Sequence, residues 1–306
     1  MRVLLIVNPC AGHRSRRDIA GEVRDVFTAS GWGVETRPTP GPGTAGMLAR
    51  QGAEEGFDAV FACGGDGTLS QVVSGLLDTG VPAGIIPTGT GNDFARTLEL
   101  PLDPVEAAER YLAGCAAPCD LFRVDDGRCW VVNIVGVGFD ARVARRVNQR
   151  SRLTGGLIAY LSCVAAELVV HRPTEVSISI DGDRWEGSAL LVAVANSRSY
   201  GAGMMIAPHA QIDDGLLDVV LVEHISRSCF AASFPRVMRG THLSLPFVHT
   251  WRGSRVSIET DEPSPVLIDG DLSGETPVNV EVADGRGLLW MPGPAPVAVE
   301  QGERGH

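Results

Sequence analysis

The sequence predicts a protein of the α/β plus β class, in which an N-terminal doubly wound α/β domain precedes an antiparallel β-rich domain. In the first hundred residues, short apolar runs alternate with segments of helical periodicity, which is typical of a parallel sheet covered by helices. After about residue 121, alternating or β-branched runs follow one another with few helices between them, which favours an antiparallel sheet. The length of 306 residues suits two domains, and we place them at 1–123 and 124–290.

The elements of the first domain follow from local patterns. Val3–Val7 is a continuous apolar run, as expected for a strand that is buried on both faces. Between Arg17 and Ala29 the apolar residues recur at helical spacing. The predicted strands are Val3–Val7, Val34–Arg37, Ala59–Cys63 and Ala83–Ile86, and the predicted helices are Arg17–Ala29, Ala45–Glu55, Leu69–Leu77 and Phe94–Leu98.

The second domain is predicted from strand-like runs that lie close together in the chain. The predicted strands are Trp130–Val137, Thr174–Ile180, Arg184–Ala195, Leu217–Val222, Arg255–Glu259 and Val278–Val282. Three helices interrupt them, at Ala141–Val147, Leu157–Val170 and Cys229–Arg239. This order indicates a largely antiparallel sheet with a few accessory helices.

The composition excludes several chemistries. All 26 basic residues are arginines, because the chain contains no lysine. A Walker A phosphate loop, a Schiff-base enzyme and a protein kinase each need a lysine at a defined place, so these classes are excluded. Any phosphate must be bound by arginine side chains and backbone N–H groups. The net charge of −11 argues against nucleic acid as a partner.

Compartment and membrane contact are inferred from cysteines, apolar segments and charge. The seven cysteines form no pair with zinc spacing, and we expect a reducing cytoplasm. The longest helical apolar stretch, Leu157–Val170, is too short to span a bilayer. A basic cluster precedes it, which leaves peripheral contact with anionic lipid as an interpretation beside that of a solvated helix face. The cluster consists of Arg142, Arg145, Arg146, Arg150 and Arg152.

Three glycine-rich turns in the first domain each follow an apolar strand. They are Asn8–Gly12 (NPCAG), Gly64–Thr68 (GGDGT) and Gly89–Arg96 (GTGNDFAR). In a doubly wound sheet such turns meet at the carboxyl ends of the strands, where ligands bind. Glycine lets the backbone approach phosphate oxygens closely, and the following helix presents unpaired N–H groups. The sequence therefore predicts a nucleotide site at this edge of the sheet.

These motifs resemble the diacylglycerol kinase catalytic-domain family, which includes bacterial lipid kinases and sphingosine kinases. Two later segments, Asn196–Asp218 and Ile268–Asp271 (IDGD), resemble further motifs of the same family in the right order. The resemblance covers roughly residues 3 to 290. It implies an NAD kinase-like nucleotide domain, a C-terminal antiparallel β-sandwich, and a chain end, at about 291–306, that returns to the first domain. It further implies ATP and Mg²⁺ as cofactors and a lipid or lipid-like alcohol as the acceptor.

The resemblance also implies roles for individual residues. The nucleotide site would consist of Asn8, Pro9, Cys10, Ala11, Gly12, Thr39, Gly64, Gly65, Asp66, Gly67, Thr68, Leu69, Ser70, Thr90, Asn92 and Asp93. Asp66 would act through a magnesium network on the phosphates, and it could instead be a turn-forming residue between glycines. A structural Mg²⁺ would be held by the Asp214 carboxylate and by carbonyl groups near Gln211 and Leu216, where a hairpin turn is the alternative.

Asp271 occupies the position of the family's general base, where glutamate is usual. A carboxylate there can accept the proton of the acceptor hydroxyl, but aspartate is shorter by about 1.5 Å, the length of one C–C bond. A surface Asx turn is the alternative for Asp271.

Two further departures from the family pattern lie near the predicted nucleotide site. Ser70-Gln71 replaces Asn-Glu, and His13 stands where a basic residue is common, leaving Arg14, Arg16 and Arg17 to supply charge.

Several functions stay open on these grounds. The first is an ATP- and magnesium-dependent kinase of a lipid or lipid-like alcohol, or of a small specialised metabolite. The second is a nucleotide-binding regulator without phosphoryl transfer, which the departures at Gln71 and Asp271 motivate. An NAD kinase shares GGDGT, but the NDFAR turn, the Pro208–Asp218 segment and the IDGD turn speak against it. A homodimer also stays open, because the sequence does not reveal the oligomeric state.

Overall fold

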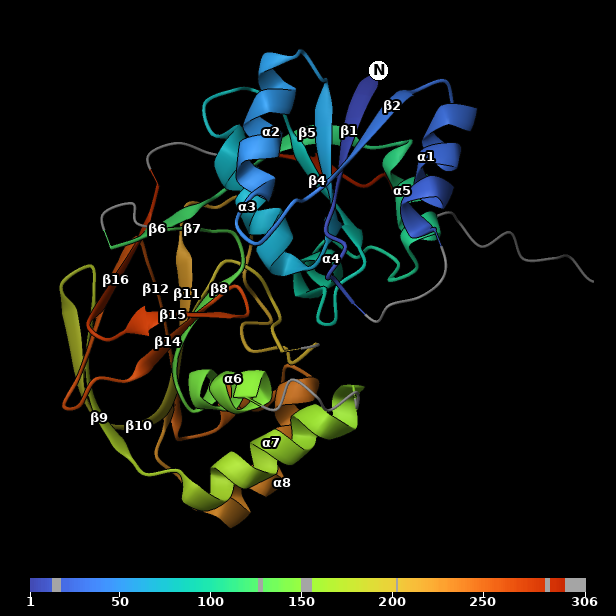
Figure 1. Cartoon of the computed structure of the whole chain (residues 1–306). Helices are drawn as coiled ribbons and strands as arrows, with labels where there is room; N and C mark the ends of the chain where they lie inside the picture. Colours follow the sequence, from blue (N-terminus) through green and yellow to red (C-terminus); the bar gives the residue numbers. More distant parts are fainter. Residues whose placement is uncertain (13–17, 126–128, 150–155, 202, 284–286, 295–306) are drawn as a thin grey trace, which may run out of the picture.

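The computed structural model contains one mostly parallel sheet and one antiparallel sheet (Figure 1). It describes residues 1–12, 18–125, 129–149, 156–201, 203–283 and 287–294. The first sheet has six strands in the order β2-β1-β3-β4-β17-β5, and all its pairs are parallel except that of β17 with β5. Its strands are β1 (Arg2–Val7), β2 (Gly33–Pro38), β3 (Ala59–Gly64), β4 (Ala83–Pro87), β5 (Cys115–Cys119) and β17 (Gly287–Met291).

Helices cover both faces of the first sheet, as the doubly wound prediction requires. Helices α2 and α3 pack together on one face, and α1 and α5 pack together on the other (Figure 1). Their bounds are α1 (Ile19–Ala29), α2 (Ala45–Glu54), α3 (Asp66–Leu76) and α5 (Pro104–Tyr111), and the short α4 is Asp93–Thr97. Because both faces are covered, Val3–Ile6 and Ala59–Cys63 are almost wholly inaccessible to solvent, which explains their unbroken apolar runs. The predicted α/β fold is confirmed.

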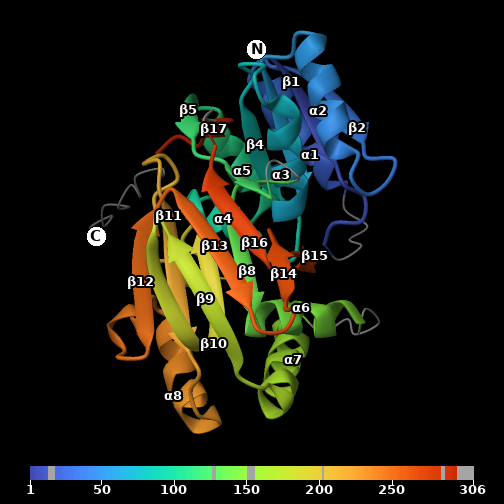
Figure 2. The same ribbon diagram turned by 90° about the vertical axis from the view of Figure 1, so that its left-hand side faces the viewer.

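The second sheet is antiparallel throughout its pairs, which confirms the predicted β-rich second part (Figure 2). It runs in the order β15-β14-β8-β10-β9-β13-β16-β6-β7, and β11 joins β10 and β12 beside this path. Its strands are β6 (Phe122–Val124), β7 (Cys129–Val131), β8 (Ile134–Gly138), β9 (Thr174–Ile180), β10 (Asp183–Ala195), β11 (Leu217–Glu223), β12 (Val248–Gly253), β13 (Arg255–Thr260), β14 (Pro265–Ile268), β15 (Asp271–Glu275) and β16 (Val278–Val282).

Three helices and one short 3₁₀ turn lie at the end of the second sheet that is farther from the first (Figures 1 and 2). They are α6 (Phe139–Gln149), α7 (Gly156–Val170), α8 (Arg227–Met238) and η1 (His242–Ser244). An apolar cluster fills the space between them and the sheet, and it includes Phe139, Leu191, Met204 and Leu267. No helix among the described residues has both the length and the apolar character that crossing a bilayer requires.

Several details of the chain differ from the sequence-based expectations, and α5, β5, β12, β14 and β15 were not among the predicted elements. Helix α3 begins at Asp66 rather than at Leu69, because Gly65 is extended and serves as its N-cap. The predicted strand at 130–137 is divided into β7 and β8. Strand β6 pairs with β16 and β7, so residues 122–124 belong to the second sheet. The segment that returns to the first sheet is β17, Gly287–Met291, and most of the predicted returning end at 291–306 lies outside the described residues.

The predicted basic cluster is partly engaged within the fold. The guanidinium of Arg146 donates to the Glu167 carboxylate at 2.7 Å, and Arg142 donates to the Thr174 hydroxyl at 3.3 Å. Arg145 is exposed, whereas Arg150 and Arg152 lie outside the described residues. The cluster therefore does not present a continuous row of free cations on α6.

Candidate functional site

A cavity of about 440 Å³ lies at the carboxyl ends of β1, β3 and β4, where the three glycine-rich turns meet. The segment after β2 closes one side of the cavity, and one residue of the second sheet, Asp271, closes another. The lining residues are Asn8, Pro9, Cys10, Ala11, Gly12, Thr39, Pro40, Gly41, Pro42, Gly43, Ala45, Gly65, Gly67, Thr68, Gln71, Gly89, Thr90 and Asp271. Most of the predicted nucleotide residues are thus gathered around one cavity, which we call the glycine cleft.

Where the glycine-rich turns meet, the wall of the glycine cleft is backbone, and it leaves no room for a side chain at Gly12 or Gly89. A Cβ atom on Gly89 would lie 2.5 Å from the Cα of Gly65, so the second and third turns touch directly. A Cβ atom on Gly12 would lie 2.2 Å from the Thr88 carbonyl oxygen, and Gly12 has a φ of +69°. The amino-terminal end of α3 opens at the same wall, and this end carries a partial positive charge. Bare backbone beside a helix N-terminus is suited to bind phosphate oxygens.

Asn8 ties the first turn to the second. Its amide nitrogen donates to the Thr68 hydroxyl at 3.1 Å, and its amide oxygen accepts from the Cys10 backbone N–H at 3.0 Å. The backbone N–H of Thr39 donates to the Val7 carbonyl at 2.8 Å and holds the third side of the cleft in register with β1. These bonds determine the width of the cleft before any ligand binds. The basic residues predicted to follow the first turn, His13, Arg14, Arg16 and Arg17, lie outside the described residues.

Asp66 stands behind the glycine cleft rather than on its lining. Its two carboxylate oxygens accept from the backbone N–H groups of Asp93, at 3.1 Å, and Phe94, at 2.8 Å, which begin α4. Burial raises the pKa of Asp66, and the backbone hydrogen bonds oppose that rise. The carboxylate therefore positions the third glycine turn through α4, and both of its oxygens are engaged in this contact.

Asn92 and Asp93 shape the third turn and do not line the cleft. Asn92 has a φ of +52°, its amide oxygen accepts from the Gly89 N–H at 2.9 Å, and its amide nitrogen donates to the Gly89 carbonyl at 2.9 Å. The Asp93 carboxylate accepts from the Gly203 N–H at 2.7 Å, which joins the turn to the second domain. Gly64 ends β3 and Leu69 is in the core, so neither reaches the cavity. These predicted binding residues act on the cleft through the backbone.

Asp271 is the single carboxylate among the described lining residues of the glycine cleft. It begins β15, directly after a turn, and its Oδ2 lies 3.1 Å from where a Cβ atom on Gly67 would be. The residue is exposed at the cavity mouth, yet loss of hydration on one side raises the pKa of its carboxyl. The shorter side chain, identified as a departure, thus still reaches the helix α3 turn.

Asp269, two residues earlier, is the residue that sequence reasoning missed. Its buried carboxylate accepts from the Ser70 hydroxyl and from the backbone N–H groups of three successive residues, 132 to 134, at 3.2, 3.1 and 3.0 Å. Burial raises its pKa to about 6. Ser70, predicted to touch the nucleotide, instead joins α3 to this carboxylate. The turn that carries Asp271 is therefore anchored to α3 of the first domain and to the segment between β7 and β8 of the second sheet. The partners are too far away in the chain for any local pattern to reveal them.

Gln71 also lines the glycine cleft, although it was noted only as a departure from the family pattern. Its side-chain oxygen accepts from the Ala45 backbone N–H at 3.4 Å, at the start of α2. A carboxylate at this position would place a negative charge on the cleft wall. The neutral amide retains a helix-capping contact without that charge.

In the 211–216 turn, where a structural Mg²⁺ was predicted, the cation beside Asp214 is the guanidinium of Arg252. The Asp214 carboxylate is paired with the guanidinium of Arg252, and its other oxygen accepts from the Leu216 N–H at 3.1 Å. Nε of the same guanidinium lies 3.5 Å from the Asp218 carboxylate. Among the described residues, no group of three or more histidine, cysteine or acidic side chains lies together as a metal site. The Asp214 carboxylate is therefore engaged by Arg252, and the assignment of Gln211, Asp214 and Leu216 to a divalent ion stays a prediction.

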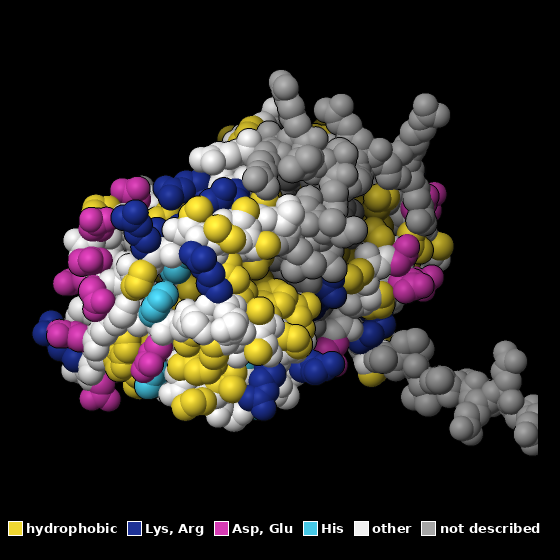
Figure 3. Space-filling model, turned by 90° about the horizontal axis from the view of Figure 1, so that it is seen from below, with side chains coloured by type: hydrophobic (Ala, Val, Ile, Leu, Met, Phe, Trp, Pro, Cys, Tyr) yellow, Lys and Arg dark blue, Asp and Glu magenta, His cyan; other side chains and the backbone are white. Residues whose placement is uncertain are grey.

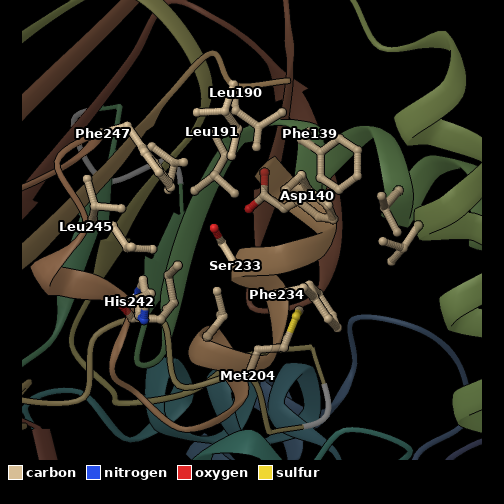
Figure 4. A pocket seen from close by; sticks show the side chains of 18 of the residues that line it. Phe139, Asp140, Leu190, Leu191, Met204, Ser233, Phe234, His242, Leu245 and Phe247 are labelled. Carbon is tan, nitrogen blue, oxygen red and sulfur yellow. Dashed lines mark hydrogen bonds between the residues drawn. The ribbon is translucent and has the colours of Figure 1, made fainter. Parts of the chain in front are cut away.

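A second cavity, almost entirely apolar, lies in the second domain between the sheet and helices α6 and α8 (Figure 4). Its volume is about 60 Å³, and its lining includes Phe139, Leu190, Met204, Phe234 and Phe247. Polar groups of Asp140, Ser233 and His242 (Figure 4) and the hydroxyl of Tyr200 interrupt this lining. Burial raises the pKa of Asp140 to about 7 and lowers the pKa of His242. We call this cavity the apolar pocket.

The comparisons with known proteins agree with this geometry. Residues 2–124 match the family model described as the diacylglycerol kinase catalytic domain, and residues 133–286 match the YegS C-terminal NAD kinase β-sandwich-like domain. A protein named diacylglycerol kinase, from Mycobacterium tuberculosis, is 33% identical over 91% of this chain and 91% of its own length. One named "Probable lipid kinase YegS-like", from Stenotrophomonas maltophilia, is 31% identical over 96% of this chain and 97% of its own.

A solved structure is similar over nearly the whole chain. The crystal structure of a diacylglycerol kinase from Bacillus anthracis superimposes with a TM-score of 0.72 at 25% identity, covering 97% of this chain and 98% of that chain. The predicted order of a nucleotide-type α/β domain and an antiparallel β domain is thus confirmed by both sequence and structure. On these grounds the chain belongs to the diacylglycerol kinase catalytic-domain family.

Proposed function

We propose that this protein transfers the γ-phosphoryl group of ATP to a hydroxyl group of a lipid or lipid-like alcohol. One observation carries the proposal. The Asp271 carboxylate, which comes from the second domain, lines a glycine-walled cleft of the first domain and lies against the first turn of α3. The Asp271 carboxylate, which can accept a proton, thereby faces the glycine-rich backbone that is suited to bind phosphate. Phosphoryl transfer depends mainly on such positioning and on charge neutralisation.

ATP fits the glycine cleft by size and by chemistry. The cavity of about 440 Å³ is in the range of small-molecule sites, and backbone at Gly12, Gly65 and Gly89 supplies close approach. Mg²⁺ would come with the triphosphate, since it is usually held by one or two carboxylates, phosphates and water. Among the described residues, Asp271 is the carboxylate on the lining that could contact it or its waters. Asp66 holds α4 in place behind the same wall.

Asp271 would accept the proton of the attacking hydroxyl. Its pKa, raised by burial, strengthens it as a base relative to a fully hydrated aspartate. Asp269 would act only as a positioning residue, because its oxygens are engaged by Ser70 and by the backbone after β7. Aspartate has one methylene fewer than glutamate and a shorter reach. The turn compensates for this, because it brings Asp271, at the start of β15, against the first turn of α3.

The apolar pocket would receive part of the acceptor's chain. The cluster of side chains around it extends to Leu267 and to Leu272, which directly follows Asp271. A hydroxyl held at Asp271 would therefore have apolar surface within reach in the same domain. The preformed volume of about 60 Å³ suits only a short segment, so a longer chain needs side chains such as Phe234 to move. Pockets of this kind discriminate weakly between chains that differ by one methylene.

Contact with a lipid surface would occur at the end of the second domain that carries α7 and α8. Seen from below, apolar side chains gather on this face, with arginines beside them (Figure 3). Val169 and Val170, at the end of α7, are 60% and 57% exposed, and Met238 of α8 is 41% exposed. The exposed Arg236 and Arg239 flank Met238. Arginine beside exposed apolar residues favours binding to anionic lipid heads.

The test is a transfer assay with γ-labelled ATP, Mg²⁺ and a set of acceptors. The acceptors are total lipid extract, dioctanoylglycerol, a sphingoid base, a polyprenol and NAD. We expect label in the lipid phase with the wild-type protein and its loss with Asp271→Asn. Asp183→Asn, which changes an exposed aspartate in the β9–β10 hairpin, is the matched control and should keep the activity. Tight ATP binding without transfer to any acceptor would contradict the proposal and favour a nucleotide-binding regulator. Label in NAD alone would favour an NAD kinase.

A further inference from the structure

Arg252 is surrounded by acidic groups from one turn and one strand. In the antiparallel pair of β11 and β12, Arg252 lies directly opposite Asp218. Its Nε lies 3.5 Å from the Asp218 carboxylate, and its terminal nitrogen NH2 donates to Asp214, in the turn that leads into β11. One guanidinium therefore bridges two carboxylates that are four positions apart in the chain. Opposite charges at facing positions of a strand pair stabilise the pairing.

The turn that Arg252 holds also touches the junction between the two sheets. Asp120, between β5 and β6, accepts from the Gly215 backbone N–H at 2.5 Å. The Asp120 N–H donates to the carbonyl of Ile212 at 2.6 Å. The 211–216 turn is thus fixed to the chain segment that passes from the first sheet to the second. A cation that neutralises Asp214 therefore also stabilises the contact of this turn with Asp120, between the two domains.

The same turn is where the family resemblance implies a magnesium ion. Such an ion would need the Asp214 carboxylate that the guanidinium already engages. A planar guanidinium supplies several N–H donors in fixed directions and stays charged at all physiological pH values. A divalent ion placed on Asp214 would lie close to this cation and be repelled by it. The acidic pair therefore has its counter-charge from the chain itself.

Asp218 shows why a counter-charge is needed at this place. Its side chain is only 14% exposed, and its carboxylate lies 3.5 Å from Nε of Arg252. Its Oδ2 is buried and has no hydrogen-bond partner among the described residues. Removing Arg252 would leave the Asp214 and Asp218 carboxylates near each other without this counter-charge, with one oxygen of Asp218 buried. That arrangement would either destabilise the turn or attract a cation from solution.

We propose that Arg252 takes the place of the structural divalent cation in this chain, so that the junction at the 211–216 turn is held without metal. The magnesium requirement of the enzyme then comes from the nucleotide alone. This inference does not depend on which acceptor is phosphorylated, because it concerns the stability of the second domain and its contact with the first.

The first experiment measures the melting temperature without nucleotide, in EDTA and in millimolar Mg²⁺. We expect the wild-type protein to melt at the same temperature in both. Arg252→Ala should melt lower in EDTA, and Mg²⁺ should raise its melting temperature by roughly 3 °C or more through binding at the vacated carboxylates. Arg255→Ala is the matched control, because Arg255 lies on the next strand and pairs with Glu281 at 3.1 Å. It should show no response to Mg²⁺. A wild-type melting temperature that falls in EDTA would overturn the proposal.

The second experiment counts divalent sites directly and does not depend on the size of a stability change. Mn²⁺ is titrated into nucleotide-free protein and its free fraction is read by electron paramagnetic resonance. We expect one additional site in Arg252→Gln relative to the wild type, and its loss in the double variant Arg252→Gln/Asp214→Asn. A site in the wild type that Asp214→Asn removes would refute the assignment, as would the absence of any new site in Arg252→Gln.

Discussion

The substitution Asp269→Asn tests whether the buried carboxylate under the turn that carries Asp271 organises the site. In the native protein this carboxylate accepts from the Ser70 hydroxyl and from three successive backbone N–H groups, those of residues 132 to 134. Asparagine has almost the same shape and tolerates the backbone φ of +47° at this position. Its amide nitrogen, however, would face at least one of these donors. The perturbation is therefore confined to hydrogen bonding.

The magnitude follows from the number of bonds that are lost. A hydrogen bond to a charged group contributes about 1.5–3 kcal/mol, and one oxygen of Asp269 serves about two donors, so the loss is about 3–6 kcal/mol. The pKa of Asp269 is raised to about 6 in the folded protein, above about 3.9 in the unfolded chain. A raised folded pKa stabilises the native state at low pH, and this contribution is lost as the pH rises through 6. The difference between wild type and variant should therefore be about 1 kcal/mol larger at pH 5 than at pH 7.

Two assays read the result. Urea unfolding gives the stability change, and the transfer assay gives kcat and the KM for ATP. We expect kcat to fall roughly 10- to 100-fold, because the turn that carries Asp271 loses its anchor, while the KM for ATP changes little. Asp181→Asn is a matched control. Asp181 has a φ of +48° and accepts from Ser254 and Arg255 N–H groups at 2.8 and 2.9 Å, but it is exposed in the β9–β10 hairpin. If Asp269→Asn behaves like this control, the reasoning is refuted.

Three further predictions concern the two cavities. Gly12→Ala should weaken ATP binding in a fluorescence titration by roughly tenfold or more, because its Cβ would lie 2.2 Å from the Thr88 carbonyl oxygen. Gly56→Ala, which also has a positive φ but nothing within 4 Å, should leave ATP affinity unchanged, and equal effects would contradict the cleft geometry. Asp271→Glu should retain or raise the transfer rate and Asp271→Ala should abolish it, so unchanged activity in the alanine variant would remove Asp271 as the base. Wild-type unfolding free energy should fall between pH 5 and pH 8 by about 2.5 kcal/mol from Asp140, whose folded pKa is raised to about 7. Asp140→Asn should reduce that slope in urea unfolding, and an unchanged slope would show that Asp140 does not titrate in this range.

Local patterns predicted the elements of the first domain as far as α4 closely, but they missed α5 and β5. The strands β1, β3 and β4 are buried on both faces, so their apolar runs are unbroken and unambiguous. Glycine turns that follow such strands gather at one edge for topological reasons, and the cleft at Gly12, Gly65 and Gly89 follows from that rule. The start of α3 was predicted three residues late, because Asp66 and Gly67 carry no apolar periodicity although they are helical.

Elements at the edges and crossings were harder to predict. Strand β17 inserts between β4 and β5 from the far end of the chain, and no local signal distinguishes it from a strand of the second sheet. Strand β12 was missed because its exposed residues alternate only weakly, and with it the position of Arg252 was missed. The polar partners of Asp269 come from both domains, so only the packed chain brings them together.

The sequence by itself determined the class of fold, the cluster of glycine turns and the aspartates that accompany them, because these depend on backbone geometry within a few neighbouring residues. The tertiary structure decided what each carboxylate does. Asp66 holds α4, Asp269 holds the turn that carries Asp271, Asp271 faces the cleft, and Asp214 is neutralised by Arg252. The physical reason is that the role of a charge depends on what lies within about 4 Å of it, and those neighbours are distant in the chain.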